Sequence, residues 1–152
     1  MVKNKTAELD NPLHAIGFKI DVVSPVLVSG RLKITQVCCQ PFGVLHGGIS
    51  ALISEGLASI GAHIAGGFRR IAGIQLTINH MKTAKIGDTI IAEATPVKSG
   101  RTIQVWHVRL WKVDDKDEKG QMVASSTLTL LCNLSQPDQA AASITLKKYA
   151  KL

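Results

Sequence analysis

Aromatic residues, cysteines and long apolar runs are scarce in this sequence, and each shortage excludes a class of protein. Aromatic residues make up 4% of the 152 residues, which leaves few side chains for stacking on nucleic-acid bases. The three cysteines have neither metal-ligand nor Cys-x-x-Cys spacing, so we expect no metal and no redox cofactor. No apolar run reaches the roughly 18 residues of a membrane span, because polar residues interrupt the longest candidate. We therefore expect no cofactor, and neither nucleic acid nor a membrane as a partner.

Basic residues outnumber acidic ones, with 18 Lys and Arg against 11 Asp and Glu and a formal net charge of +7. These charges are scattered along the chain, so a small phosphate-bearing ligand fits at least as well as nucleic acid as the anionic partner. Hydrophobic residues make up 45% of the chain, enough for the core of one globular domain of this length. The charged N-terminus has no apolar segment behind it, so we expect no secretory signal.

The order of the apolar patterns predicts one long helix, at 47–64, and six strands. The strands are expected at 18–23, 26–36, 69–81, 89–98, 102–113 and 121–134. Because the last four follow one another through short turns, we expect an antiparallel sheet wrapped around the helix, an α+β fold of order β-β-α-β-β-β-β. Residues 1–134 then form a single domain with a short polar N-terminal lead, and 135–152 form a C-terminal tail.

The predicted helix has two different faces. A stripe of large apolar residues at steps of three and four is expected to pack on the sheet; it comprises Ile49, Leu52, Ile53, Leu57, Ile60 and Ile64. Another face carries Glu55 among small residues, which are Gly48, Ala51, Ala58, Ser59 and Ala62. Small side chains let another backbone approach closely, so we expect a second element, such as another helix, against this face.

Glu55 could take part in catalysis together with the N-terminus of the predicted helix. Gly47 and Gly48 open the helix, where the first N–H groups lack internal partners and can hold an oxyanion. Glu55 could then act as a general base or as a nucleophile. Eight residues separate Gly47 from Glu55, about 12 Å along a helix axis, too far for one reacting carbonyl to touch both. Two antiparallel helices across a two-fold axis would bring each Gly47 to the other Glu55, which predicts a homodimer with two shared active sites.

The segment "HGGISALISEGLASIGA" resembles that of hotdog-fold acyl-CoA thioesterases, in the branch typified by glutamate-type 4-hydroxybenzoyl-CoA thioesterases. The resemblance extends over most of residues 15–134 and implies a hotdog fold. It implies that Glu55 is the catalytic carboxylate and that the Gly47 N–H polarises the thioester carbonyl. Gln40 would help to hold that carbonyl and His46 would orient it. Ser59 would position water or the glutamate.

The resemblance also implies partners and substrate contacts. The substrate is expected to be an aromatic acyl-CoA thioester, with 1,4-dihydroxy-2-naphthoyl-CoA of phylloquinone synthesis as the specific expectation. The phosphate groups of coenzyme A suit the net positive charge, and the turn "KSGRT" resembles a family segment that meets coenzyme A. The residues expected to contact coenzyme A are Lys98, Arg101, Ser125, Ser126 and Thr127. Family members assemble as homodimers and usually as homotetramers.

The tail ends in Ala150, Lys151 and Leu152. This tripeptide is a close variant of Ser-Lys-Leu, a C-terminal address read by the peroxisomal import receptor on a free, flexible end. We therefore expect a peroxisomal location and the import receptor as a partner.

Two alternatives to hydrolysis stay open at the level of the sequence. One is a hotdog hydratase or dehydratase acting on enoyl thioesters, with His46 as the base. The other is a non-catalytic acyl-CoA-binding module. The sequence also leaves open whether Glu55 is a nucleophile or a general base.

Overall fold

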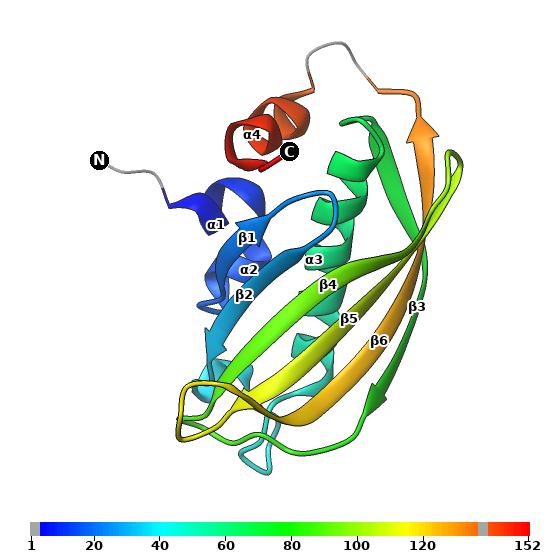
Figure 1. Ribbon diagram of the computed structural model, residues 1–152. Coiled ribbons are helices and arrows are strands. Elements are labelled where there is room, and N and C mark those ends of the chain that lie inside the picture. The colour runs from blue at the N-terminus through cyan, green and yellow to red at the C-terminus, as the bar shows by residue number, and fades with distance from the viewer. Residues whose placement is uncertain (1–3, 137–139) are drawn as a thin grey trace.

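The computed structural model describes residues 4–136 and 140–152, in which a curved sheet wraps around one long helix (Figure 1). The long helix is α3 (Gly47–Ala65), and the sheet consists of β1 (Lys19–Val23), β2 (Val28–Lys33), β3 (Arg70–His80), β4 (Thr89–Ser99), β5 (Ile103–Val113) and β6 (Lys119–Leu134). The remaining elements are α1 (Lys5–Leu9), α2 (Asn11–Ala15), the 3-10 turn η1 (Gln36–Cys38) and α4 (Ala141–Tyr149). The predicted order of the long helix and six strands, and each predicted position to within a few residues, are confirmed.

All strand pairs are antiparallel, and the order across the sheet is β1-β2-β4-β5-β6-β3. The strands β4, β5 and β6 are neighbours joined by short turns, as predicted. In contrast, β3 pairs with β6 and lies at the far edge of the sheet instead of beside β4. The chain therefore runs from α3 into the edge strand β3 and then crosses to the middle of the sheet, where β4 lies. The helix that carries the candidate site consequently lies next to an edge strand.

The helix α3 packs very closely against the concave side of the sheet. The stripe residues Ile53 and Leu57 are fully buried, and a methyl group at Gly61 would overlap the ring of the buried Trp106 on β5. Ala58 and Ala62 are also fully buried inside the same chain. That part of the small-residue face is therefore covered by the chain itself and is closed to a second subunit.

Buried polar contacts join α3 to the sheet. The Ser126 hydroxyl of β6 lies 2.9 Å from the Ser54 hydroxyl of α3 and donates toward it. On β5, the Gln104 amide donates to the Ala62 carbonyl at 3.1 Å and accepts from the Trp106 indole at 2.8 Å. Such bonds are satisfied in one rotation of the helix only, so they fix which residues of α3 face the sheet.

The segment expected as a tail contains α4, which packs on the domain beside α1 (Figure 1). Its Leu146 is buried, while Lys148 and the Tyr149 hydroxyl bind the Glu8 carboxylate at 3.0 and 2.9 Å. Beyond the helix, the Lys151 N–H donates to the Val23 carbonyl at 2.8 Å. Within α4, Ser143 and Leu146 alone are buried, so this nine-residue helix has no apolar stripe by which its sequence could be recognised.

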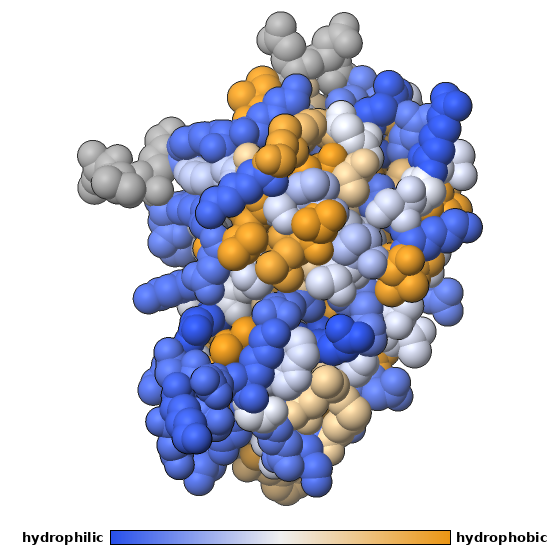
Figure 2. Space-filling model, viewed as in Figure 1, coloured by the Kyte–Doolittle hydropathy of each residue, from blue (hydrophilic) through white to orange (hydrophobic). Residues whose placement is uncertain are grey.

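By length and composition alone, α3 could cross a membrane, although its apolar run is interrupted. More than half of that window is buried inside the protein, which is the position of a core helix. On the face seen in Figure 2, hydrophilic residues cover most of the periphery and hydrophobic residues form smaller patches between them.

Candidate functional site

The start of α3 presents one free backbone donor. His46 is the N-cap, and its Nδ1 accepts the Gly48 N–H at 2.8 Å. Its carbonyl accepts the N–H groups of Ile49 and Ser50 at 2.9 and 3.2 Å. For the Gly47 N–H, no partner lies within residues 4–136 and 140–152. A free N–H at the positive end of a 19-residue helix can donate to an oxygen that develops negative charge.

Gln40 lies in the loop before His46, and its side chain is held by that loop. Its Oε1 accepts the Phe42 N–H, and its backbone N–H donates to the Val44 carbonyl. Because the hydrogen bond from Phe42 occupies the amide oxygen, the amide nitrogen of Gln40 is the atom left to bind another partner. Gln40 is half-buried and is therefore able to offer N–H donors, as its predicted role requires.

Glu55 lies half-buried in the middle of α3, against the edge strand β3. Its carboxylate has no hydrogen-bond or ion-pair partner in the described part of the chain. Removing a carboxylate from water without pairing it costs free energy. Other acidic side chains are paired, for example Glu93 with Lys119 at 2.6 Å and Asp88 with Lys112 at 3.1 Å. The Glu55 carboxylate is therefore available to a ligand or to a second chain.

Gly73 of β3, which was not among the residues predicted from the sequence, makes room for this carboxylate. A methyl group at Gly73 would overlap the Glu55 Oε1. The pairing of β3 with β6 is irregular between Gly73 and Gln75, so the strand is bulged at this point. An isolated glycine within a strand pattern is itself a signal of a bulge or of a close approach.

His80, at the end of β3, is a second residue of the candidate site that was not predicted from the sequence. A methyl group at Gly47 would lie 3.1 Å from the Cε1 and Nε2 atoms of its ring. The His80 ring therefore covers the residue that carries the free N–H. A histidine at a strand end gives no sequence signal that would connect it to residue 47.

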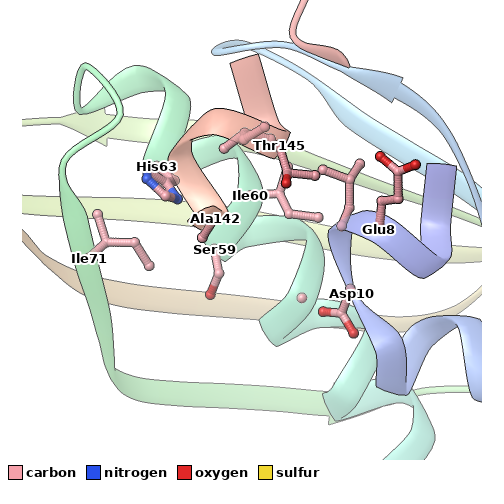
Figure 3. A pocket seen from close by; sticks show the side chains of 11 residues that line it. Glu8, Asp10, Ser59, Ile60, His63, Ile71, Ala142 and Thr145 are labelled. Atoms are coloured by element: carbon pink, nitrogen blue, oxygen red, sulfur yellow. The ribbon is translucent and has the colours of Figure 1, made fainter. Parts of the chain in front are cut away.

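Ser59, one turn beyond Glu55, lines a cavity between α3, β3, α1 and α4 (Figure 3). No hydrogen bond joins Ser59 to Glu55 in the structure as described. Its predicted role toward water or the glutamate therefore stays a prediction, and its observed position is in the wall of this cavity.

The predicted coenzyme A contacts at the β4–β5 turn lie far from Gly47 of the same chain. Lys98 and Arg101 are exposed, and Arg101 lies beside Gly66 at the C-terminal end of α3. A helix of 19 residues separates its two ends by about 28 Å. Within one chain, the structure does not bring Arg101 and the Gly47 N–H together.

The three predicted contacts on β6 do not share one environment. Ser126 is 2% exposed and points into the core toward Ser54, so it has no route to a coenzyme A groove. Ser125 and Thr127 lie on the outer face, where the Ser125 hydroxyl is 2.8 Å from His107 Nε2. Partial burial and, secondarily, the Arg109 charge lower the pKa of His107. Ser125 and Thr127 are therefore the members of this trio that a ligand can reach.

Comparisons with known proteins agree with this fold. The family model of the thioesterase superfamily matches residues 42–119. The 1,4-dihydroxy-2-naphthoyl-CoA thioesterase 2 of Arabidopsis thaliana is 52% identical over 86% of this chain and 84% of its own length. The 1,4-dihydroxy-2-naphthoyl-CoA hydrolase of Escherichia coli is 33% identical over 78% of this chain and 84% of its own. A thioesterase structure from Haemophilus influenzae has a TM-score of 0.73 at 23% identity, covering 90% of this chain and 92% of that one.

This chain belongs to the thioesterase superfamily, and the hotdog fold expected from the sequence is confirmed. The match to the family model includes Gly47, Glu55 and Gly73 but neither α1 nor α4.

Gly73→Ala is expected to lower thioester hydrolysis by about tenfold or more, because it displaces the Glu55 carboxylate by its overlap with Oε1. The measurement is kcat for thiol release by the purified variant. Gln75→Ala, an exposed change two residues along the same strand, is the control. Equal kcat values for the two variants would show that the carboxylate does not depend on the space at residue 73.

Proposed function

We propose that this protein hydrolyses an aromatic acyl-CoA thioester, specifically 1,4-dihydroxy-2-naphthoyl-CoA, to the free acid and coenzyme A. The observation that carries the proposal is the unpaired, half-buried Glu55 carboxylate on the same helix as the free Gly47 N–H. The substrate follows from the relatives of Arabidopsis thaliana and Escherichia coli, both named for the 1,4-dihydroxy-2-naphthoyl thioester.

The geometry supports a direct mechanism for this hydrolysis. The thioester carbonyl oxygen accepts the Gly47 N–H, and the helix N-terminus stabilises the negative charge that develops on it. Glu55 then removes a proton from the attacking water molecule as the water oxygen bonds to the carbonyl carbon. As the C–S bond breaks, coenzyme A leaves and its sulfur takes up a proton. In the alternative route, Glu55 attacks the carbonyl carbon itself, the C–S bond breaks and coenzyme A leaves with a proton on its sulfur, and water then opens the resulting anhydride.

The contacts of His46 weigh against a hydratase or dehydratase with His46 as the base. Its Nδ1 lone pair accepts the Gly48 N–H, so the neutral ring carries its proton on Nε2. A ring in this state can donate a hydrogen bond to a substrate but has no lone pair left to remove a proton. A non-catalytic binding module, in turn, has no need of an unpaired carboxylate at residue 55.

We propose that each active site is shared between two chains, in a homodimer or a homotetramer built from it. Glu55 follows Gly47 by eight residues of continuous helix, about 12 Å along the axis. One carbonyl group cannot contact both residues of one chain. A two-fold arrangement of two copies supplies the Gly47 N–H from one chain and the carboxylate from the other.

Glu55→Gln is expected to lower kcat by about 10²–10⁴-fold, because the amide neither accepts a proton at neutral pH nor attacks a carbonyl. Thiol release is measured with 1,4-dihydroxy-2-naphthoyl-, benzoyl- and long-chain aliphatic CoA thioesters. Glu118→Gln, an exposed change in the β5–β6 turn, is the control. Full activity of Glu55→Gln would end the assignment of Glu55, and a wild-type preference for long aliphatic chains would end the aromatic assignment.

Mixing two inactive variants tests the shared site. Gly47→Pro removes the N–H; proline is favoured at the first helical position, but its Cβ meets the His80 ring at 3.1 Å, so the melting temperature of this variant is measured to verify folding. Gly47→Pro and Glu55→Gln chains, unfolded together and refolded at equal amounts, are expected to regain about a quarter of wild-type activity, since half of the dimers hold one intact site of two. Each variant refolded alone is the control. No recovery from folded, mixed oligomers would place both residues in one chain's site.

We further propose a peroxisomal location when Leu152 carries the free C-terminal carboxylate. In support, Leu152 is 89% exposed, and the import receptor reads such tripeptides. The Lys151 N–H bond to Val23 must open for the receptor to bind. A fluorescent protein fused ahead of residue 1 is expected to coincide with a peroxisomal marker, and Leu152→Asp in the same fusion is expected to disperse it. Identical distributions of the two fusions would overturn this location.

A further inference from the structure

A cavity of about 210 Å³ lies between the helices on the open side of α3 (Figure 3). Its wall includes Asp10 from the α1–α2 junction, Ser59 and His63 from α3, Ile71 from β3, and Ala142 and Thr145 from α4. The chemistry proposed for Gly47, Gln40 and His46 does not use this space.

Glu55 does not itself line the cavity, but its neighbours on α3 and the neighbours of Gly73 on β3 do. On α3, Gly56 and Ser59 in its wall follow Glu55 by one and four residues, the latter about 6 Å along the axis. On β3, Ile71 precedes Gly73 by two residues, and Gly73 is the residue that Glu55 abuts. A group attached to a carbonyl at Glu55 can therefore extend into the cavity along both elements.

The far wall of the cavity is formed by α4, and two sets of contacts hold this helix in place. At its end, Lys148 and Tyr149 bind the Glu8 carboxylate at 3.0 and 2.9 Å. At its start, the buried Ser143 hydroxyl donates to the Phe68 carbonyl at 2.9 Å and lies 3.0 Å from His63 Nε2. The wall is therefore fixed, and it limits how far an acyl group can reach.

Asp10 contributes a charged acceptor to this cavity. Its Oδ1 caps α2 by accepting the Leu13 N–H at 2.9 Å. Its Oδ2 faces Gly56, where an added methyl group would lie 3.0 Å away. One carboxylate oxygen thus stays directed at α3, and Figure 3 shows the Asp10 carboxylate on the side of the cavity where Ser59 lies. A carboxylate in a partly apolar wall favours a ligand that brings a hydroxyl donor.

We infer that this cavity holds the ring system of the acyl group, that α4 sets the length it accepts, and that Asp10 accepts a hydrogen bond from a ring hydroxyl. The inference deepens the proposed hydrolysis and rests on it. It assigns substrate selection to two segments, α1–α2 and α4, that lie outside the matched family region of residues 42–119.

The first test fills the cavity from α4. Thr145→Phe is expected to lower kcat/KM for 1,4-dihydroxy-2-naphthoyl-CoA by about tenfold or more while leaving a short acyl-CoA within about twofold. Ile144→Phe adds an aromatic ring at the neighbouring residue, which is 57% exposed and lies outside the cavity wall. This control is expected to leave both substrates unchanged, and melting temperatures of both variants verify folding. If folded Thr145→Phe matches Ile144→Phe on both substrates, α4 does not bound the acyl site.

The second test compares two ring systems. Asp10→Asn keeps an N-cap for α2 but removes the charged acceptor. It is expected to lower kcat/KM about tenfold or more for 1,4-dihydroxy-2-naphthoyl-CoA and to leave 2-naphthoyl-CoA, which lacks both hydroxyls, within about twofold. An unchanged ratio between the two substrates overturns the role of Asp10.

Different results would overturn the proposed hydrolysis and the assignment of the cavity. A wild-type protein that releases no thiol from any aromatic acyl-CoA overturns the proposed function. A wild-type protein that hydrolyses these substrates, with ratios that neither Thr145→Phe nor Asp10→Asn changes, overturns the cavity assignment alone.

Discussion

The enclosure of α3 by a single curved sheet is the constraint on which the rest of the structure depends. At Gly61 the helix approaches the Trp106 ring so closely that a side chain does not fit. The bonds of Ser54 with Ser126 and of Gln104 with Ala62 are satisfied at one rotation of the helix. Because the helix can neither move away from the sheet nor turn, every position along it has a defined neighbour. Glu55 consequently faces the edge strand β3, and the Gly47 N–H at the start of α3 has no partner within the described residues.

The candidate site consists of two polar groups on this rigid helix that have no partner within the described residues. His46 satisfies the Gly48 N–H, which leaves Gly47 as the free donor of the first turn within the described residues. The Glu55 carboxylate is half-buried without a partner, in a space that the absence of a side chain at Gly73 provides. Groups held unpaired in this way are ready to bind a substrate, and functional sites commonly contain them at the expense of stability.

Much of this fold and part of this site could be predicted from the sequence, and the failures have physical reasons. Gly47–Ala65 was recognisable because its apolar stripe runs over five turns, whereas the nine residues of α4 bury only Ser143 and Leu146. The place of β3 beside β6 is a long-range pairing that chain order does not encode. Glu55 and Gly47 were identified from their local pattern, while Gly73 and His80 join the site through tertiary contacts. The burial of Ser126 could have been predicted, since the even-numbered residues of β6 alternate onto the core face.

The enclosure of α3 by the sheet also explains why different segments of the chain have different proposed roles. The proposed reacting groups lie on α3 and beside β3, inside the region matched by the thioesterase superfamily, where packing in the core holds them rigidly. The walls of the proposed acyl cavity come partly from α1, α2 and α4, which pack on the open side of α3 through contacts such as those of Glu8. Segments on the outside of a domain can change in length and sequence without disturbing its core. On the proposed assignment of the cavity, a hotdog domain keeps one thioester chemistry and accepts a different acyl group when the helices that cover α3 change.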